Sequence, residues 1–203
     1  MKKTLTMQSR RNKGWIVVWW YSLAFFILLA ASFFILLVLK NLSPETLKGS
    51  ALDNSCVTER ETRIVRGNSL EGIVSPGHTI TILRNYYACH KPERGDIVAY
   101  YYAGSKDPLI KIVKAIGGDV WSMQKNESGA FTIIVNGSPL TTSTNDPYAI
   151  PQTKSAMLER YATIYPTIPD DALLLLGNIP TGSLDSTKFG LAHIKDVIGR
   201  VIF

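Results

Sequence analysis

Residues 15–39 form an uninterrupted run of 25 residues without one charged side chain. A helix needs about 20 apolar residues to cross a bilayer, whereas the apolar region of a cleavable secretion signal has only about 7 to 15. Trp15, Trp19, Trp20 and Tyr21 crowd its start, where amphipathic rings favour the interface between water and lipid. A buried helix of a soluble protein is the alternative, but it is seldom this long and apolar. The run therefore predicts a permanent transmembrane anchor.

The basic residues before the anchor predict its orientation. Residues 1–14 contain Lys2, Lys3, Arg10, Arg11 and Lys13 and no acidic residue. The positive-inside rule places this tail in the cytoplasm and everything after the anchor outside. These five leave 17 of the 22 Lys and Arg residues for the rest of the chain, against 16 Asp and Glu. The exported part is thus nearly neutral, and the net charge of +6 does not indicate nucleic-acid binding.

After the anchor, the chain predicts a mainly β domain. Residues 40–57, with Pro44 and Gly49 and no long apolar period, are expected to form a polar linker. In residues 58–203, short runs rich in β-branched and aromatic residues alternate with Gly, Pro, Asn and Asp, as is typical of strands. Asn136-Gly137 predicts a tight hairpin turn. The expected strands are ETRIVRG, HTITILRNY, DIVAYYY, LIKIVKAI, FTIIV, ALLLLG and DVIGRVIF.

One part of this domain lacks a clear strand pattern. Residues 141–165 are the least regular, and we expect a smaller inserted region of mixed structure over about 120–168. The predicted fold is therefore a single N-terminal transmembrane helix followed by an exported antiparallel-β domain with that insertion.

Metal and cofactor chemistry is not predicted. The three histidines, His78, His90 and His193, have no metal-ligand spacing, and there is no Cys-x-x-Cys. A G-x-S-x-G elbow and a phosphate-binding glycine loop are missing as well. Cys56 and Cys89 both fall on the exported side, where an oxidising compartment would let them pair. The sequence gives no distance between them, so a disulfide and two buried thiols both fit.

The strand LIKIVKAI, residues 109–116, carries two lysines among aliphatic neighbours. Desolvation disfavours the ammonium form and lowers a lysine pKa from its reference value near 10.4. A neutral amine near the working pH can act as a general base for a serine hydroxyl, and Ser69 lies in a glycine-flanked turn. The alternative is that Lys111 and Lys114 only lay their stems on apolar surface with the heads in water.

Four ordered segments resemble the bacterial type I signal peptidases, the membrane-anchored Ser/Lys endopeptidases of the S26 family. Residues 69–78 follow the spacing of that family's S-M-x-P-T-L-x-x-G-D box, although five of its letters differ. RGDIVAYYY resembles the R-G-D-I-V-V-F strand, and Lys111 stands eight residues before Asp119, as the family's base stands before its Gly-Asp. VNGSPL resembles the family's hairpin, and LLLLGNIPTGSLDSTKFG follows the G-D-N-x-x-x-S-x-D-S-R box.

The resemblance implies a role for each matched residue. Ser69 would be the nucleophile and Lys111, rather than Lys114, the general base. Ser183 would hold the Lys111 amine in place, while Asp185 and Ser186 would support the site around it. The substrate would lie extended beside the first strand, with small side chains before the scissile bond as in the A-x-A pattern of export signals. The residues expected to bind it are Ile64, Val65, Arg66, Gly67 and Asn68.

Three charged positions of the family pattern are uncharged here. Ile112 and Thr187 replace arginines, and Asn178 replaces an aspartate. Because charges of both signs are lost together, no unpaired charge need remain in a low-dielectric site. The pattern favours a divergent but self-consistent active site, with an inactive relative as the alternative.

The function implied is removal of signal peptides from exported preproteins at the outer or periplasmic face of a bacterial inner membrane. Expected partners are preprotein signal peptides, the lipid bilayer and the export translocon, and not nucleic acid. Two other functions fit the same residues. One is a dedicated maturation peptidase for conjugative pilin or another narrow client, and the other is a non-catalytic tethered β domain that binds extended peptides.

Overall fold

A computed structural model of the chain describes residues 28–29, 32–33, 53–103, 105 and 107–203. It divides into two compact units, Met1–Asp53 and Asn54–Phe203. In the first unit, residues 28–29 and 32–33 are helical, and the Ser32 hydroxyl donates to the carbonyls of Leu28 and Leu29. No helix within the described residues is long and apolar enough to cross a bilayer. The predicted tail, most of the predicted anchor and residues 40–52 of the predicted linker lie outside the described residues.

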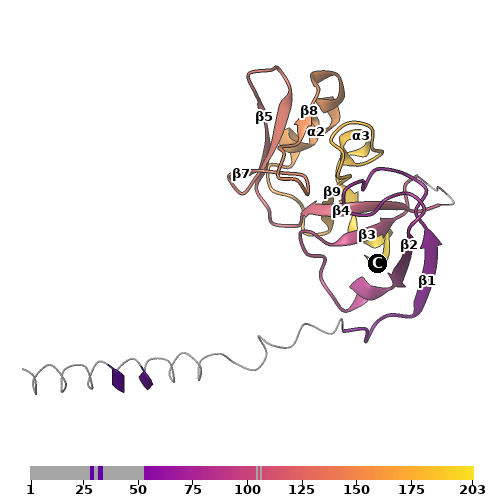
Figure 1. Cartoon of the computed structure of the whole chain (residues 1–203). Helices are drawn as coiled ribbons and strands as arrows, with labels where there is room; N and C mark the ends of the chain where they lie inside the picture. Colours follow the sequence, from indigo (N-terminus) through magenta and orange to yellow (C-terminus); the bar gives the residue numbers. More distant parts are fainter. Residues whose placement is uncertain (1–27, 30–31, 34–52, 104, 106) are drawn as a thin grey trace, which may run out of the picture. The chain divides into compact units, whose positions relative to one another are not determined.

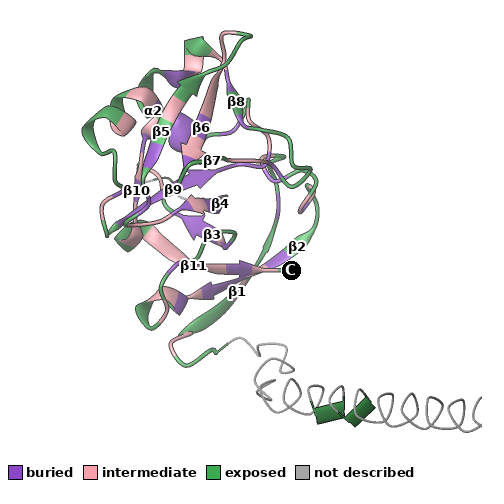
Figure 2. Ribbon diagram, turned by 90° about the vertical axis from the view of Figure 1, so that its left-hand side faces the viewer, coloured by how far each residue is buried: buried purple, intermediate pink, exposed green. Residues whose placement is uncertain are grey.

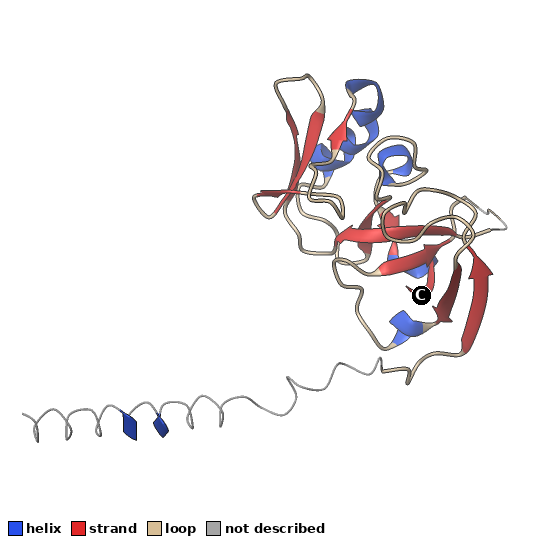
Figure 3. Ribbon diagram, viewed as in Figure 1, coloured by secondary structure: helices blue, strands red, loops and turns tan. Residues whose placement is uncertain are grey.

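The second unit is built mainly from antiparallel strands (Figure 1, Figure 3). Its larger sheet has the order β1-β2-β11-β3-β4-β9-β10. Strand β11, near the C-terminus, pairs between β2 and β3, so the end of the chain completes the centre of the sheet. The strands are β1 (Glu59–Ile64), β2 (Thr79–Arg84), β3 (Ile97–Tyr100), β4 (Leu109–Ala115), β9 (Ala172–Leu176), β10 (Ala192–His193) and β11 (Val197–Ile202).

A smaller sheet and a helix lie within residues 121–164. Asn136 and Gly137 form the two-residue turn between β6 and β7, both with positive φ, so the predicted hairpin turn is confirmed. In Figure 1 this sheet and helix α2 gather at one end of the domain, with β1–β3 at the other. The elements are β5 (Trp121–Lys125), β6 (Phe131–Val135), β7 (Ser138–Pro139), β8 (Ala149–Ile150) and α2 (Gln152–Ile164).

Three short helical segments complete the domain: η2 (Tyr86–Ala88), α3 (Ser186–Phe189) and η3 (Ile194–Asp196). Asp185 caps α3, accepting a hydrogen bond from the Thr187 amide.

Most of the buried hydrophobic residues lie on the strands, as the purple parts of the ribbon in Figure 2 show. All five residues of β9 are buried, because this strand contributes to two neighbouring core clusters. One cluster joins β9 to the smaller sheet and α2, around Trp121 and Leu158. Another is formed by β2, β3, β4 and β11 with the loop that follows β1, around Leu70 and Ile82. That second cluster fixes the loop carrying Ser69 to the sheet.

Each of the seven expected strands corresponds to an observed strand. β7 is the second strand of the predicted hairpin. Strands β5, β8 and β10 were not predicted, and two of them are only two residues long. No helix was predicted for residues 152–164 either. In α2 only Ser155 and Leu158 are buried, so the helix has too narrow an apolar stripe to reveal its period.

Candidate active site

Ser69 lies in a loop whose two ends are held together. The Val65 amide donates to the His78 carbonyl, and the Gly77 amide donates back to the Val65 carbonyl. Inside the loop, Leu70 is only 2% exposed and packs into the sheet core. Ser69 itself is half-buried. The burial of Leu70 in the core therefore fixes the position of the adjacent Ser69.

Lys111 of β4 meets this serine. Its Nζ lies 3.0 Å from Ser69 Oγ and donates to the Ile110 carbonyl at 2.8 Å. Lys111 is only 3% exposed. Burial lowers the pKa of its amine from the ordinary value of 10.5 to about 8, and the negative charge of Asp185 partly opposes that decrease. A buried amine of this pKa is in part neutral near physiological pH and can accept a proton from the hydroxyl.

Lys114, the other lysine of β4, is directed elsewhere. Its Nζ donates to the Thr141 carbonyl at 2.7 Å and lies over the Tyr148 ring, 5.1 Å from the centroid. Burial also lowers the pKa of Lys114. The structure thus brings one of the two lysines to Ser69, and it is the one selected by the spacing to Asp119. Asp119 is itself buried and accepts hydrogen bonds from Arg94, Ile116 and Asn136.

The three other predicted site residues are buried at or just before the start of α3: Ser183, Asp185 and Ser186. Asp185 accepts hydrogen bonds from the Gly177 amide and from Thr187, which leaves its charge fixed and buried. Ser186 accepts the Leu175 amide and so supports β9. Ser183 Oγ is buried without a hydrogen-bond partner among the described residues. The expected bond between Ser183 and the Lys111 amine is therefore not formed. The Ser183 hydroxyl instead packs closely against Gly177, so closely that a Cβ atom on residue 177 would lie only 2.7 Å from Ser183 Oγ.

Asn178 is a further site residue, which the sequence identified only as a departure from a pattern. Its amide donates to the Ser69 carbonyl at 2.6 Å, and its side-chain Nδ2 donates to the Glu71 carbonyl at 2.6 Å. Nδ2 also donates to Ser143 Oγ, while Oδ1 accepts the Ser143 amide at 2.8 Å. Asn178 thus joins the loop carrying Ser69 to the loop around Ser143. An aspartate could not donate these side-chain hydrogen bonds.

A cleft of about 440 Å³ opens beside Ser69 and Lys111. One side of the cleft is lined by residues 62–67, Ser69, Leu70 and Ile82, and the other side by residues 107–111. Four of the five expected substrate-binding residues, 64–67, are in this lining. Asn68 is not in the lining; it is exposed in the loop, and its carbonyl accepts a hydrogen bond from the Glu71 amide. Arg63 and Asp107 line the cleft and were not expected.

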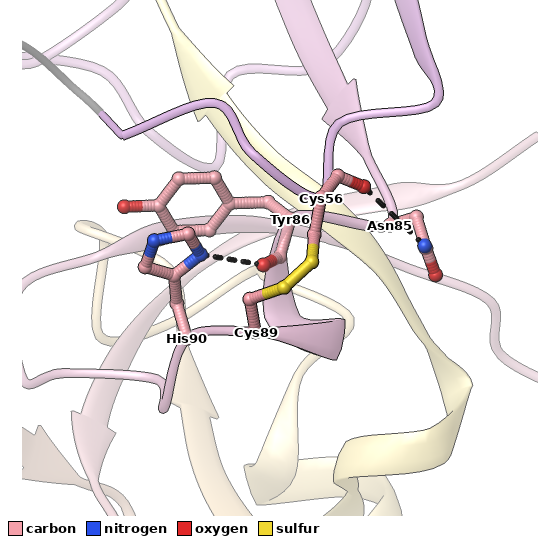
Figure 4. The surroundings of a disulfide bond; sticks show 5 residues. All are labelled: Cys56, Asn85, Tyr86, Cys89 and His90. Atoms are coloured by element: carbon pink, nitrogen blue, oxygen red, sulfur yellow. Dashed lines mark hydrogen bonds between the residues drawn. A yellow bond between two sulfur atoms is a disulfide. The ribbon is translucent and has the colours of Figure 1, made fainter.

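Cys56 and Cys89 form a disulfide, with Cα atoms 5.8 Å apart (Figure 4). Nearby, Asn85 Nδ2 donates to the Cys56 carbonyl at 3.3 Å, and the His90 ring stacks on Tyr86. The disulfide ties the entry into β1 to the helix η2 that follows β2, and the nucleophile loop lies between the two cysteines in sequence. No group of three or more His, Cys, Asp or Glu side chains that could hold a metal ion occurs in the described part of the chain.

Comparison with known proteins identifies the family. The profile described as "Signal peptidase, peptidase S26" matches residues 15–203. The chain belongs to this signal peptidase family. Among solved structures, the signal peptidase I of Enterococcus faecalis is similar at 25% identity, covering 55% of this chain and 97% of that one with a TM-score of 0.39. A search of the curated proteins finds no match.

Proposed function

We propose that this signal peptidase family member is a membrane-anchored serine endopeptidase that cleaves signal peptides from exported preproteins. Ser69 is its nucleophile and Lys111 its general base. The observation that carries the proposal is the 3.0 Å separation between Ser69 Oγ and a buried lysine amine, at the wall of an open cleft. Nucleophile and base are within hydrogen-bond reach, as covalent catalysis by a serine requires.

The reaction follows from this geometry. Neutral Lys111 takes the proton of the Ser69 hydroxyl as Oγ attacks the scissile carbonyl, and it later returns that proton to the leaving amine. Water then hydrolyses the acyl-enzyme. The Ser69 amide is the donor for the developing oxyanion, because Gly67, two residues earlier, has no hydroxyl to offer. The fixed charge of Asp185 stabilises Lys111 when it carries the proton.

The cleft suits an extended peptide, because strand edges form both of its walls. β1 pairs only with β2, so its other edge faces the cleft, and β9 pairs with β4 only from Ile112 onward. Four successive antiparallel pairings connect β1 to β4, through β2, β11 and β3. Because the number of pairings is even, β1 and β4 run in the same direction. A substrate strand between them is parallel to both or antiparallel to both, and it bonds to their main chains by β-augmentation.

The anchor and the location belong to the same proposal. Residues 15–39 form a single transmembrane helix with the basic tail in the cytoplasm, which places the peptidase domain on the outer or periplasmic face. The Cys56–Cys89 disulfide is consistent with an exported domain, because disulfides persist in oxidising compartments. The bilayer and the export translocon are then the partners that bring preproteins to the cleft.

Cleavage of a preprotein with an A-x-A site by the detergent-solubilised full chain tests the proposal. Ser69→Ala and Lys111→Met should each abolish cleavage. Lys114→Met is the matched control, because it removes a neighbouring amine of the same strand that does not approach the serine. Cleavage that survives either of the first two changes would contradict the dyad. Absence of cleavage by the folded wild type would favour a dedicated client or a peptide-binding role.

A further inference from the structure

Charged side chains face one another across the cleft. Arg63 of β1 and Arg66, just beyond β1, lie on one wall, and Asp107 lies on the segment that leads into β4. Arg63 Nη1 is 3.7 Å from Asp107 Oδ1, and Arg66 Nη1 is 3.7 Å from Asp107 Oδ2. A single carboxylate is thus shared by two guanidinium groups from the opposite wall.

The two arginines are not equally satisfied. Arg63 also pairs with Glu61, which in turn accepts a hydrogen bond from Arg84 at 2.6 Å. Arg66 has Asp107 as its one ionic partner within the described residues, and its side chain is 86% exposed. Asp107 is exposed as well. An ion pair this exposed and this long contributes little to stability, so exchanging its carboxylate for another costs little.

We propose that the cleft selects substrates with an acidic side chain close to the scissile bond. Its carboxylate replaces Asp107 as the partner of Arg66. The inference rests on the proposed function, because it needs a peptide lying along β1. Arg66 precedes Ser69 by three residues, and an extended chain advances about 3.3 Å per residue. The acidic side chain therefore falls within about three or four residues of the cleaved bond.

The cleft favours a carboxylate over other polar groups for two reasons. Guanidinium binds carboxylate through two parallel hydrogen bonds, which neutral amides cannot match. The cleft lining also contains two arginines against one acidic residue, so an added negative charge is attracted and an added positive charge repelled. The accessible apolar part of the lining, Ile64, Leu109 and Ile110, remains free to take the small side chains of an A-x-A sequence.

Competition between matched peptides tests the inference. Each peptide carries the same A-x-A site. Glu, Gln or Lys is placed in turn at each of the four positions on either side of the bond, leaving out the two alanines. At one position, the detergent-solubilised full chain should cleave the Glu peptide with a kcat/KM about fivefold above that of the Gln peptide, and the Lys peptide should be slower still. Raising the salt concentration should reduce this preference.

Three variants assign the preference to its residues. Arg66→Gln should remove the preference for Glu, whereas Asp107→Asn should increase it by removing the competing carboxylate. Arg60→Gln is the matched control, since Arg60 is an exposed arginine of β1 that does not line the cleft, and it should leave the preference unchanged. Equal cleavage of the Glu and Gln peptides at every position would overturn the inference and leave the proposed function standing. Failure to cleave any peptide would overturn both.

Discussion

The lowered pKa of Lys111 predicts how the reaction rate depends on pH. Burial lowers this pKa from 10.5 to about 8, which corresponds to about 3 kcal/mol of lost hydration of the charged form. In the proposed mechanism Lys111 is the general base and must be neutral, so the rate follows the deprotonated fraction of its amine. With a pKa of about 8, that fraction is roughly a tenth at pH 7 and roughly nine tenths at pH 9. The rate should therefore rise about tenfold over this range and then level off.

The assay is single-turnover cleavage of a preprotein by the full chain in detergent, measured between pH 6 and pH 10. Single turnover isolates acylation from product release, so the midpoint of the curve reports the pKa of the base in the enzyme–substrate complex. Lys114→Met should give the same midpoint as the wild type, because the Lys114 amine bonds to Thr141 and not to Ser69.

Two results would refute this reasoning. A lysine with the ordinary pKa of 10.5 would give a rate that rises about a hundredfold from pH 7 to pH 9 without levelling off. A midpoint near 6 would point to a different titrating group, such as a histidine. Either curve would show that the buried Lys111 amine does not govern the reaction.

Three further predictions concern stability and geometry. Because the folded-state pKa of Lys111 lies below its unfolded value, unfolding takes up a proton between pH 8 and 10.5, so the free energy of unfolding should rise by about 2 kcal/mol from pH 8 to pH 9.5. Urea titrations should show this slope in wild type, and finding it undiminished in Lys111→Met would contradict the assignment. Replacing Cys56 and Cys89 by serine should lower the free energy of unfolding by about 4 kcal/mol, because the disulfide closes a loop with a sequence separation of 33; a loss below about 1 kcal/mol in urea would count against that estimate. Asn178→Asp should lower kcat tenfold or more with little change in KM, because a carboxylate cannot donate to the Glu71 carbonyl; a rise in KM alone would instead indicate a role in binding.

Local sequence was enough to predict the strands, because their signal is local. Runs such as FTIIV and ALLLL are continuous β-branched or aliphatic segments bounded by turn residues. The turn Asn136-Gly137 needs positive φ at two successive residues, which few other dipeptides accept. Helix α2 was missed because it buries only two of its residues, and β5 because its five residues include three polar ones.

The site was predicted only where spacing along the chain constrained it. Lys111 was separable from Lys114 because only Lys111 stands eight residues before Asp119, as the base of the resembling family stands before its Gly-Asp. The role of Asn178 depends on its hydrogen bond to the Glu71 carbonyl, 107 residues away in the sequence. The ion pair between Arg63 and Asp107 depends on how the sheet places β1 opposite the segment before β4. Neither follows from composition or period. The missing Ser183 bond likewise depends on which way one hydroxyl is turned in the folded chain.

The exposed edge of β1 also bears on the solubility of the empty domain. A strand with unpaired main-chain groups can add a strand from any other chain, including a second copy, and so begin aggregation. Four of the six residues of β1 are charged, Glu59, Arg60, Glu61 and Arg63. If the β1 strand of a second copy paired with this edge, the charged side chains of the two strands would be held next to one another. They would also lose part of their hydration, which costs free energy. The charges on β1 thus oppose association of two domains through this edge.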